Sequence, residues 1–111
     1  MRLAELEPQF IRYESGGIID PRNISLAEAQ GLWFLCPLCF AQNHGNVGTH
    51  ACEVTFEGRG VLPEQGSHNK EGKPTRWNVA GSTFADLTIT PSIQLQGGCN
   101  WHGFITNGEA S

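Results

Sequence analysis

Two short clusters of cysteine and histidine, far apart in the chain, constrain its fold more than any other feature. They are Cys36-Pro-Leu-Cys39 and Cys99-Asn-Trp-His102. In each cluster the potential ligands have the spacing at which a tight turn directs both side chains toward one point. Two such pairs can complete a tetrahedral zinc site, with Zn–S distances of about 2.3 Å. A shared metal would require these two distant segments to meet in the folded protein.

The identity of the metal ligands is only partly determined by the sequence. We expect three ligands to be the sulfur atoms of Cys36, Cys39 and Cys99. His102 has the right spacing to be the fourth, but His50 and His44 follow the first cluster closely and compete for that position. Water in the fourth position would make the zinc catalytic. We rank that arrangement lower, because three thiolates donate charge that weakens the Lewis acidity of the metal.

The composition favours a small β-rich fold. The 111 residues, a length typical of one domain, include 14 glycines and 6 prolines, and only 16% are charged. A domain of this size has a high surface-to-volume ratio and gains stability from a bound metal. We therefore predict a small β-rich α+β domain, with a short antiparallel sheet and one short helix, clamped by a zinc site.

The charge pattern argues against nucleic acid as a partner. The 7 basic residues are scattered among 11 acidic ones, and the net charge is −4. No apolar run approaches the length of about 20 residues needed to cross a membrane, and the N-terminal segment lacks the features of a signal peptide. We expect a cytoplasmic protein without membrane contact, whose 4 cysteines are thiols or metal ligands rather than disulfides.

Hydrophobic alternation and turn residues predict the order of the elements. We expect strands at residues 9–14, 32–35, 50–57, 87–96 and 101–106, and a short helix at residues 26–30 that starts at the capping box Ser25–Glu28. Residues 58–76 have the composition of an exposed, mobile loop. We interpret residues 1–24 as an N-terminal extension packed on a single zinc-stabilised domain of residues 25–111.

The last two predicted strands form a hairpin. Apolar and polar residues alternate from Leu87 to Gln96, which places Ser92 on the polar face. Pro91 lacks a backbone donor, so we expect its strand to lie at a sheet edge or to contain a bulge. Gly97-Gly98 makes the turn, and the returning strand carries His102.

A series of short motifs resembles a known protein family. The motifs are Cys36-Pro-Leu-Cys39-Phe, Gly48-Thr-His50, Arg59-Gly-Val, Arg76-Trp77-Asn, Asp86-Leu-Thr, Pro91-Ser-Ile93, Gly98-Cys-Asn-Trp-His-Gly-Phe-Ile105 and Asn107-Gly108. They resemble a small zinc-knuckle domain of uncharacterised function that is found mostly in bacteriophages and prophages. More divergent relatives occur beside bacterial ubiquitin-like conjugation genes and resemble peptidases. Those relatives share the Pro-Ser-Ile and Cys-x-x-His motifs.

The hairpin and this resemblance together raise a second hypothesis, that of a serine hydrolase. In this hypothesis Ser92 is the nucleophile, His102 is the general base, and Asp86, or alternatively Glu109, is the acid that orients the histidine. Backbone N–H groups of the Gly97-Gly98 turn would stabilise the oxyanion. Cys99 beside His102 is a weaker candidate nucleophile, because that role conflicts with metal binding.

Zinc binding and catalysis compete for His102, since an imidazole bound to zinc cannot take a proton from Ser92. Two functions therefore remain. The first is a zinc-stabilised, phage-type accessory domain that binds another protein in a bacterial host cell. The alternative is a small serine peptidase or hydrolase that uses Ser92 and His102 on ubiquitin-like or other protein substrates. The identity of the fourth zinc ligand decides between them.

Overall fold

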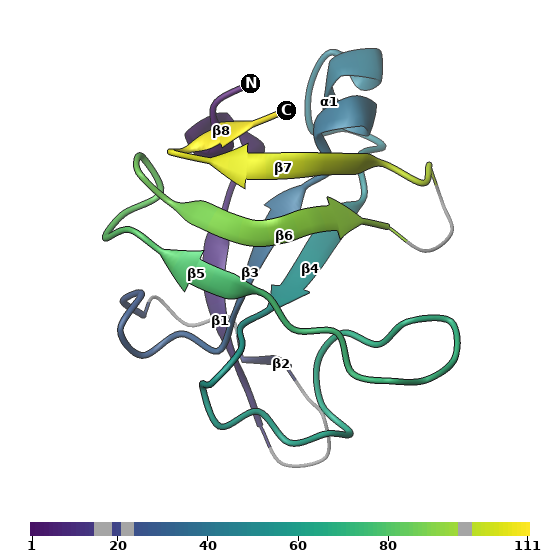
Figure 1. Ribbon diagram of the computed structural model, residues 1–111. Coiled ribbons are helices and arrows are strands. Elements are labelled where there is room, and N and C mark those ends of the chain that lie inside the picture. Colours follow the sequence, from purple (N-terminus) through teal and green to yellow (C-terminus); the bar gives the residue numbers. More distant parts are fainter. Residues whose placement is uncertain (15–18, 21–23, 96–98) are drawn as a thin grey trace.

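In the residues that the structure describes, two antiparallel sheets of four strands each form the framework (Figure 1). The computed structural model describes residues 1–14, 19–20, 24–95 and 99–111. The elements are η1 (Leu3–Leu6), β1 (Gln9–Tyr13), β2 (Ile19–Asp20), β3 (Gly31–Leu35), α1 (Pro37–Asn43), β4 (Ala51–Thr55), β5 (Asn78–Ala80), β6 (Thr88–Gln94), β7 (His102–Thr106) and β8 (Glu109–Ala110). The predicted class, a small β-rich domain with one short α-helix, is confirmed for the described residues.

The first sheet has the strand order β2-β1-β3-β4. Its longest pairing joins β3 to β4, where Leu32 lies opposite Val54 and Phe34 lies opposite Cys52. All four side chains are buried, as the apolar run of residues 32–35 and the alternation of residues 50–57 predict. β1 pairs directly with β3, so residues of the predicted N-terminal extension contribute a strand to this sheet. The division of the chain at residue 24 stays a prediction.

The second sheet has the order β5-β6-β7-β8 and contains the predicted hairpin. The connection from β7 to β8 is a two-residue turn at Asn107 and Gly108, whose φ angles of 49° and 76° match the type I′ turn that Asn-Gly favours. β6 lies between two other strands, and its pairing with β7 shifts register between Ile89 and Ile93. The predicted bulge is thus present, and Pro91 is exposed there instead of lying on the apolar face.

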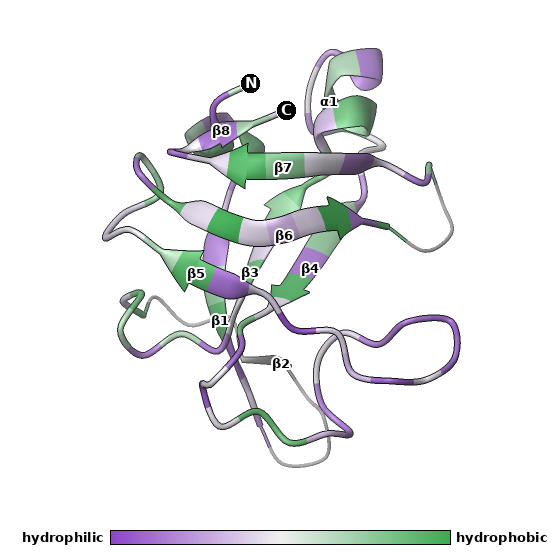
Figure 2. Ribbon diagram, viewed as in Figure 1, coloured by the Kyte–Doolittle hydropathy of each residue, from purple (hydrophilic) through white to green (hydrophobic). Residues whose placement is uncertain are grey.

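One hydrophobic cluster joins the two sheets. Its buried members include Leu32, Phe34, Val54 and Phe56 beside the first sheet and Ile89, Ile93 and Ile105 in the second. Cys52 belongs to it, with only 2% of its surface exposed. Apolar residues are concentrated in the strands, whereas the long connection between β4 and β5 is mostly hydrophilic (Figure 2). Burial between the sheets therefore supplies the main driving force for folding.

The short helix lies at a different place from the one predicted. Residues 26–28 form a single turn, whereas the only α-helix in the described part of the chain is α1. Helix growth from Leu26 would use its carbonyl oxygen for the Gln30 N–H, but Arg59 binds that oxygen at 2.8 Å and Gln30 N donates to Ile11 O. Tertiary hydrogen bonds thus override the local capping signal.

Within the described ranges, no helix is long and apolar enough to cross a membrane.

The long connection between β4 and β5 is held by hydrogen bonds, although its composition predicts a mobile loop. The Nη atoms of Arg76 donate to the carbonyl oxygens of Leu62, Gln65, Ser67 and Thr75 at 2.8–3.1 Å. A Cβ on Gly66 would lie 2.5 Å from Thr55 Oγ1, so only glycine allows this close approach to β4. The hydrogen bonds of the Arg76 guanidinium group thus hold together a loop that contains no helix or strand.

Candidate active site and metal centre

Four potential metal ligands meet where three parts of the chain converge. Cys36 is the N-cap of α1 and Cys39 lies in its first turn, His50 directly precedes β4, and Cys99 lies in the connection from β6 to β7. Pro37 at the first helical position favours a helix here instead of the tight knuckle that the sequence suggested. The first helical turn carries both sulfur atoms to the same site.

The ligand atoms of these residues have the spacing of one tetrahedral site. All four atoms lie within 4.8 Å of one another. Cys36 Sγ is 3.3 Å from Cys99 Sγ, and His50 Nε2 is 3.2 Å from the same sulfur. In a tetrahedral site with Zn–S bonds of about 2.3 Å, the sulfur atoms are separated by about 3.8 Å. Cys36, Cys39, His50 and Cys99 could therefore hold one metal ion.

The pKa values of the thiols depend on burial and on the close approach of the four ligand residues. Burial raises the pKa of Cys36, and burial together with the neighbouring sulfur atoms raises the pKa of Cys39 to about 11. In contrast, the hydrogen bond with His50 lowers the pKa of Cys99 to about 6. A divalent cation would offset the repulsion among three thiolates and favour their ionised, metal-binding forms.

His102 is not a member of this group and instead contacts Ser92. Its Nε2 atom lies 2.9 Å from Ser92 Oγ, within hydrogen-bond distance. In the register, His102 lies opposite Gln94, so Ser92 is its diagonal neighbour on the adjacent strand. Of the other histidines considered, His44 is the exposed C-cap of α1. The structure therefore assigns His50 and His102 to different surroundings.

Ser92 lines an open cleft of about 680 Å³. One wall is β6 with its flanking residues, and the other walls are Glu53 of β4 and the segments of residues 67–69 and 74–77. Trp77 Nε1 donates a hydrogen bond to Ser92 O at 3.1 Å, which holds the serine backbone against this wall. The serine is half-buried and His102 is exposed. Both side chains are therefore accessible from solvent.

The structure does not bring Asp86 to His102. The Asp86 carboxylate accepts hydrogen bonds from the backbone N–H groups of Ser82 and Thr83 at 2.9 and 2.8 Å, and from the Ser82 hydroxyl at 3.0 Å. These bonds lower the pKa of Asp86 to about 2. Asp86 precedes β6, whereas Ser92 lies near its other end, a separation of about 20 Å at 3.3 Å per residue. The carboxylate caps a turn.

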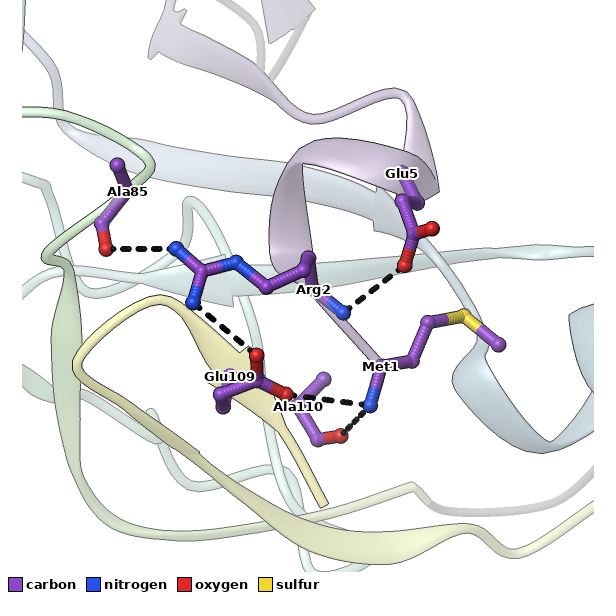
Figure 3. A network of polar contacts seen from close by, with 6 residues as sticks. All are labelled: Met1, Arg2, Glu5, Ala85, Glu109 and Ala110. Carbon is purple, nitrogen blue, oxygen red and sulfur yellow. Dashed lines mark hydrogen bonds and ion pairs between the residues drawn. The ribbon is translucent and has the colours of Figure 1, made fainter.

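Glu109 is also engaged elsewhere (Figure 3). Its Oε2 lies 3.3 Å from the Met1 amino group, and its Oε1 accepts a hydrogen bond from Arg2 Nη1 at 3.1 Å. These contacts lower the pKa of the carboxylate. Neither acid that the sequence suggested is placed to orient His102. The Gly97-Gly98 turn, suggested as the source of oxyanion donors, lies outside the described residues.

Replacing Asp86 by asparagine is expected to lower the stability of the fold at neutral pH. Because the pKa of Asp86 is lowered in the folded protein, its carboxylate stabilises the fold above its unfolded pKa, and this contribution is lost as the pH falls toward about 2. Wild type should therefore have the higher Tm at neutral pH, and the difference should disappear in acid. Thermal unfolding measured across this range tests both points. An equal Tm of wild type and Asp86→Asn at neutral pH would contradict the turn-capping role.

Sequence reasoning missed the residues that build the cleft. Arg76 and Trp77 stood out only as a motif, and nothing in the sequence indicated that Trp77 donates to the Ser92 carbonyl group. Glu53 lines the cleft together with residues of the long loop, so its place there depends on how that loop folds. Phe104 of β7 has 54% of its surface exposed.

Comparison with known proteins places the chain in a family. Residues 12–111 match the family model described as "Bacterial ubiquitination-like system serine protease (BubE)". The chain belongs to the BubE family. No curated protein and no solved structure matches it. BubE membership confirms the part of the resemblance that pointed to peptidases of bacterial ubiquitin-like systems, whereas the association with phages stays a prediction.

Proposed function

We propose that this protein is a serine protease that cleaves a protein substrate in a ubiquitination-like system. Ser92 is the nucleophile and His102 is the general base. The observation that carries the proposal is the 2.9 Å contact between Ser92 Oγ and His102 Nε2 beside an open cleft. The description of the BubE family as serine proteases supports the same reaction class.

The reaction follows the two-step course of serine hydrolases. His102 Nε2 accepts the proton of the Ser92 hydroxyl while Ser92 Oγ attacks the carbonyl carbon of the substrate. His102 then gives this proton to the departing amine. Water attacks the resulting acyl-enzyme, with His102 again acting as base. Trp77 supports the first step by holding the Ser92 carbonyl group, so that the hydroxyl remains directed toward the imidazole.

We further propose that the metal centre is structural and holds zinc through Cys36, Cys39, His50 and Cys99. A set of three sulfur atoms and one nitrogen suits zinc and leaves no open coordination position. This ligand set also separates the two roles that competed for His102. A protein-binding module needs no activated serine, so the contact between Ser92 and His102 gives the protease precedence over the accessory-domain interpretation.

A fluorophosphonate probe tests the proposed nucleophile. The reagent forms a phosphorus–oxygen bond with an activated serine and releases fluoride, and we expect it to modify one residue, Ser92. Ser92→Ala should abolish labelling, and His102→Ala should slow it about 10²–10⁴-fold. Intact-protein and peptide mass spectrometry identify the modified residue.

Ser25→Ala provides a matched control, because it removes an exposed serine hydroxyl whose contact is Glu28. This variant should be labelled at the wild-type rate. Labelling at another serine, or no labelling of the folded wild-type protein, would contradict the proposed function and leave a non-catalytic binding domain as the better explanation.

A further inference from the structure

We propose that the substrate crosses β6, with the acyl side of its scissile bond in the cleft and its leaving-group side over Phe104 on β7. This inference rests on the proposed function, because it assigns sides to the reaction of Ser92. It adds a specificity residue, Phe104, and a substrate class: proteins with an apolar group on the leaving-group side of the cleaved bond.

The order of strands separates the two sides. β6 lies between β5 and β7, and Ser92 belongs to β6. The cleft extends from β6 toward Arg76 and Trp77, which directly precede β5. His102 belongs to β7, on the opposite side of β6 (Figure 1). The nucleophile thus has the cleft on one side and its base on the other.

The chemistry then decides which part of the substrate lies on which side. The proton that His102 Nε2 takes from Ser92 must pass to the departing amine, so the leaving group has to lie within hydrogen-bond distance of that nitrogen. This requirement places the leaving group toward β7. The acyl group remains on the other side of the scissile bond and extends into the cleft.

Phe104 occupies the surface that the leaving group would meet. Ile93 lies opposite Gly103, and both side-chain positions face inward, so Ser92, His102 and Phe104 share the outer face of the sheet. The Phe104 ring lies 6.5 Å from the His102 ring between centroids, at an interplanar angle of 27°. Its 54% exposure leaves an apolar ring beside the reacting imidazole. An apolar leaving group would cover this ring and exclude water from it.

Aminolysis of the acyl-enzyme probes this side alone. p-Nitrophenyl acetate should acetylate Ser92 and release p-nitrophenolate. An added amine then attacks the ester carbonyl carbon: the C–N bond forms, the bond to Ser92 Oγ breaks, and the amine proton passes through His102 to that oxygen. By microscopic reversibility, the attacking amine occupies the position of the leaving group. The probes are leucinamide and glycinamide, compared per unprotonated amine.

We expect the ratio of aminolysis to hydrolysis to be about tenfold higher for leucinamide than for glycinamide, as is typical for a contact with an apolar side chain. Phe104→Ala should remove this preference, and Phe104→Leu should retain part of it. Hydrolysis of the acetyl-enzyme should fall less in Phe104→Ala than aminolysis by leucinamide does, because water does not need the ring. Val47→Ala, which truncates an apolar side chain that is 85% exposed, should keep the preference.

The outcomes separate the two proposals. If p-nitrophenyl acetate leaves no acetyl group on Ser92, the proposed function itself fails. If Ser92 is acetylated but both amines react equally, or if Phe104→Ala keeps the preference, only the side assignment fails. If Phe104→Ala slows hydrolysis as much as aminolysis, Phe104 acts by positioning His102, and the proposed contact with the leaving group is wrong.

Discussion

His102→Ala is expected to lower the rate of Ser92 acylation about 10²–10⁴-fold, which is the usual contribution of a positioned general base. The reason is that the variant leaves Ser92 Oγ without the group that accepts its proton at 2.9 Å. Rapid-mixing measurement of p-nitrophenolate release from p-nitrophenyl acetate gives the acylation rate directly. Because His102 is exposed at the start of β7, the variant should fold with little change in stability.

The double variant of Ser92 and His102 tests whether the two residues act together. Ser92→Ala should remove the burst of p-nitrophenolate, and adding His102→Ala to it should cause almost no further loss, since the two residues act as a unit. Ser25→Ala should behave as wild type. An unchanged burst in His102→Ala, or additive effects of the two substitutions, would show that the contact does not serve catalysis.

Cys99→Ser is expected to remove the metal and unfold the protein. A structural zinc site contributes an apparent binding free energy of about 10–16 kcal/mol in small zinc domains, whereas the total stability of a domain is about 5–15 kcal/mol. The free energy lost with one of the four ligands is therefore expected to be large enough to unfold the domain. Metal analysis of purified wild type should find about one zinc per chain, and circular dichroism should show loss of the native spectrum in the variant or after chelation.

The two histidines provide a matched pair of variants for this test. His50→Ala should lower the zinc content and the Tm, because His50 Nε2 lies with the three sulfur atoms. His102→Ala should retain about one zinc per chain, because its ring contacts Ser92 instead. A folded wild-type protein without zinc, or zinc loss in His102→Ala alone, would overturn the proposed ligand set.

Loss of the metal should also affect the reaction. Cys99 lies in the connection between β6, which carries Ser92, and β7, which carries His102. A metal bound there ties this connection to the start of α1 and to the residue before β4. The metal centre and the Ser92–His102 contact are thus linked through the two residues, Asn100 and Trp101, that separate Cys99 from His102.

Much of the fold could be predicted because it depends on local patterns. The alternation from Leu87 to Gln96 and the Asn107-Gly108 turn identify β6 and the end of β7 from neighbouring residues alone, whereas β5 and β8 were not predicted. The helix prediction at residues 26–30 failed because Arg59, far along the chain, binds the carbonyl oxygen of Leu26. Local patterns contain no information about such a partner.

The candidate site could likewise be predicted only in part from local patterns. The neighbouring strands suggested that Ser92 and His102 could meet, because residues in a hairpin are close in sequence. The orienting acid could not be predicted in this way: Asp86 and Glu109 have suitable carboxylates, but the fold directs one to a turn and the other to Met1 and Arg2. The cleft depends on a loop that Arg76 organises through four carbonyl groups, which no periodicity reveals.

By itself, the sequence determined which chemical groups are available: three cysteines with metal-binding spacing, several histidines, and a serine one strand away from one of them. Only the tertiary structure decided that His50 lies with the cysteines and His102 with Ser92. The physical reason is that spacing along the chain sets what a residue can reach, whereas the pairing of β6 with β7 and the approach of α1 to their connection set what it does reach.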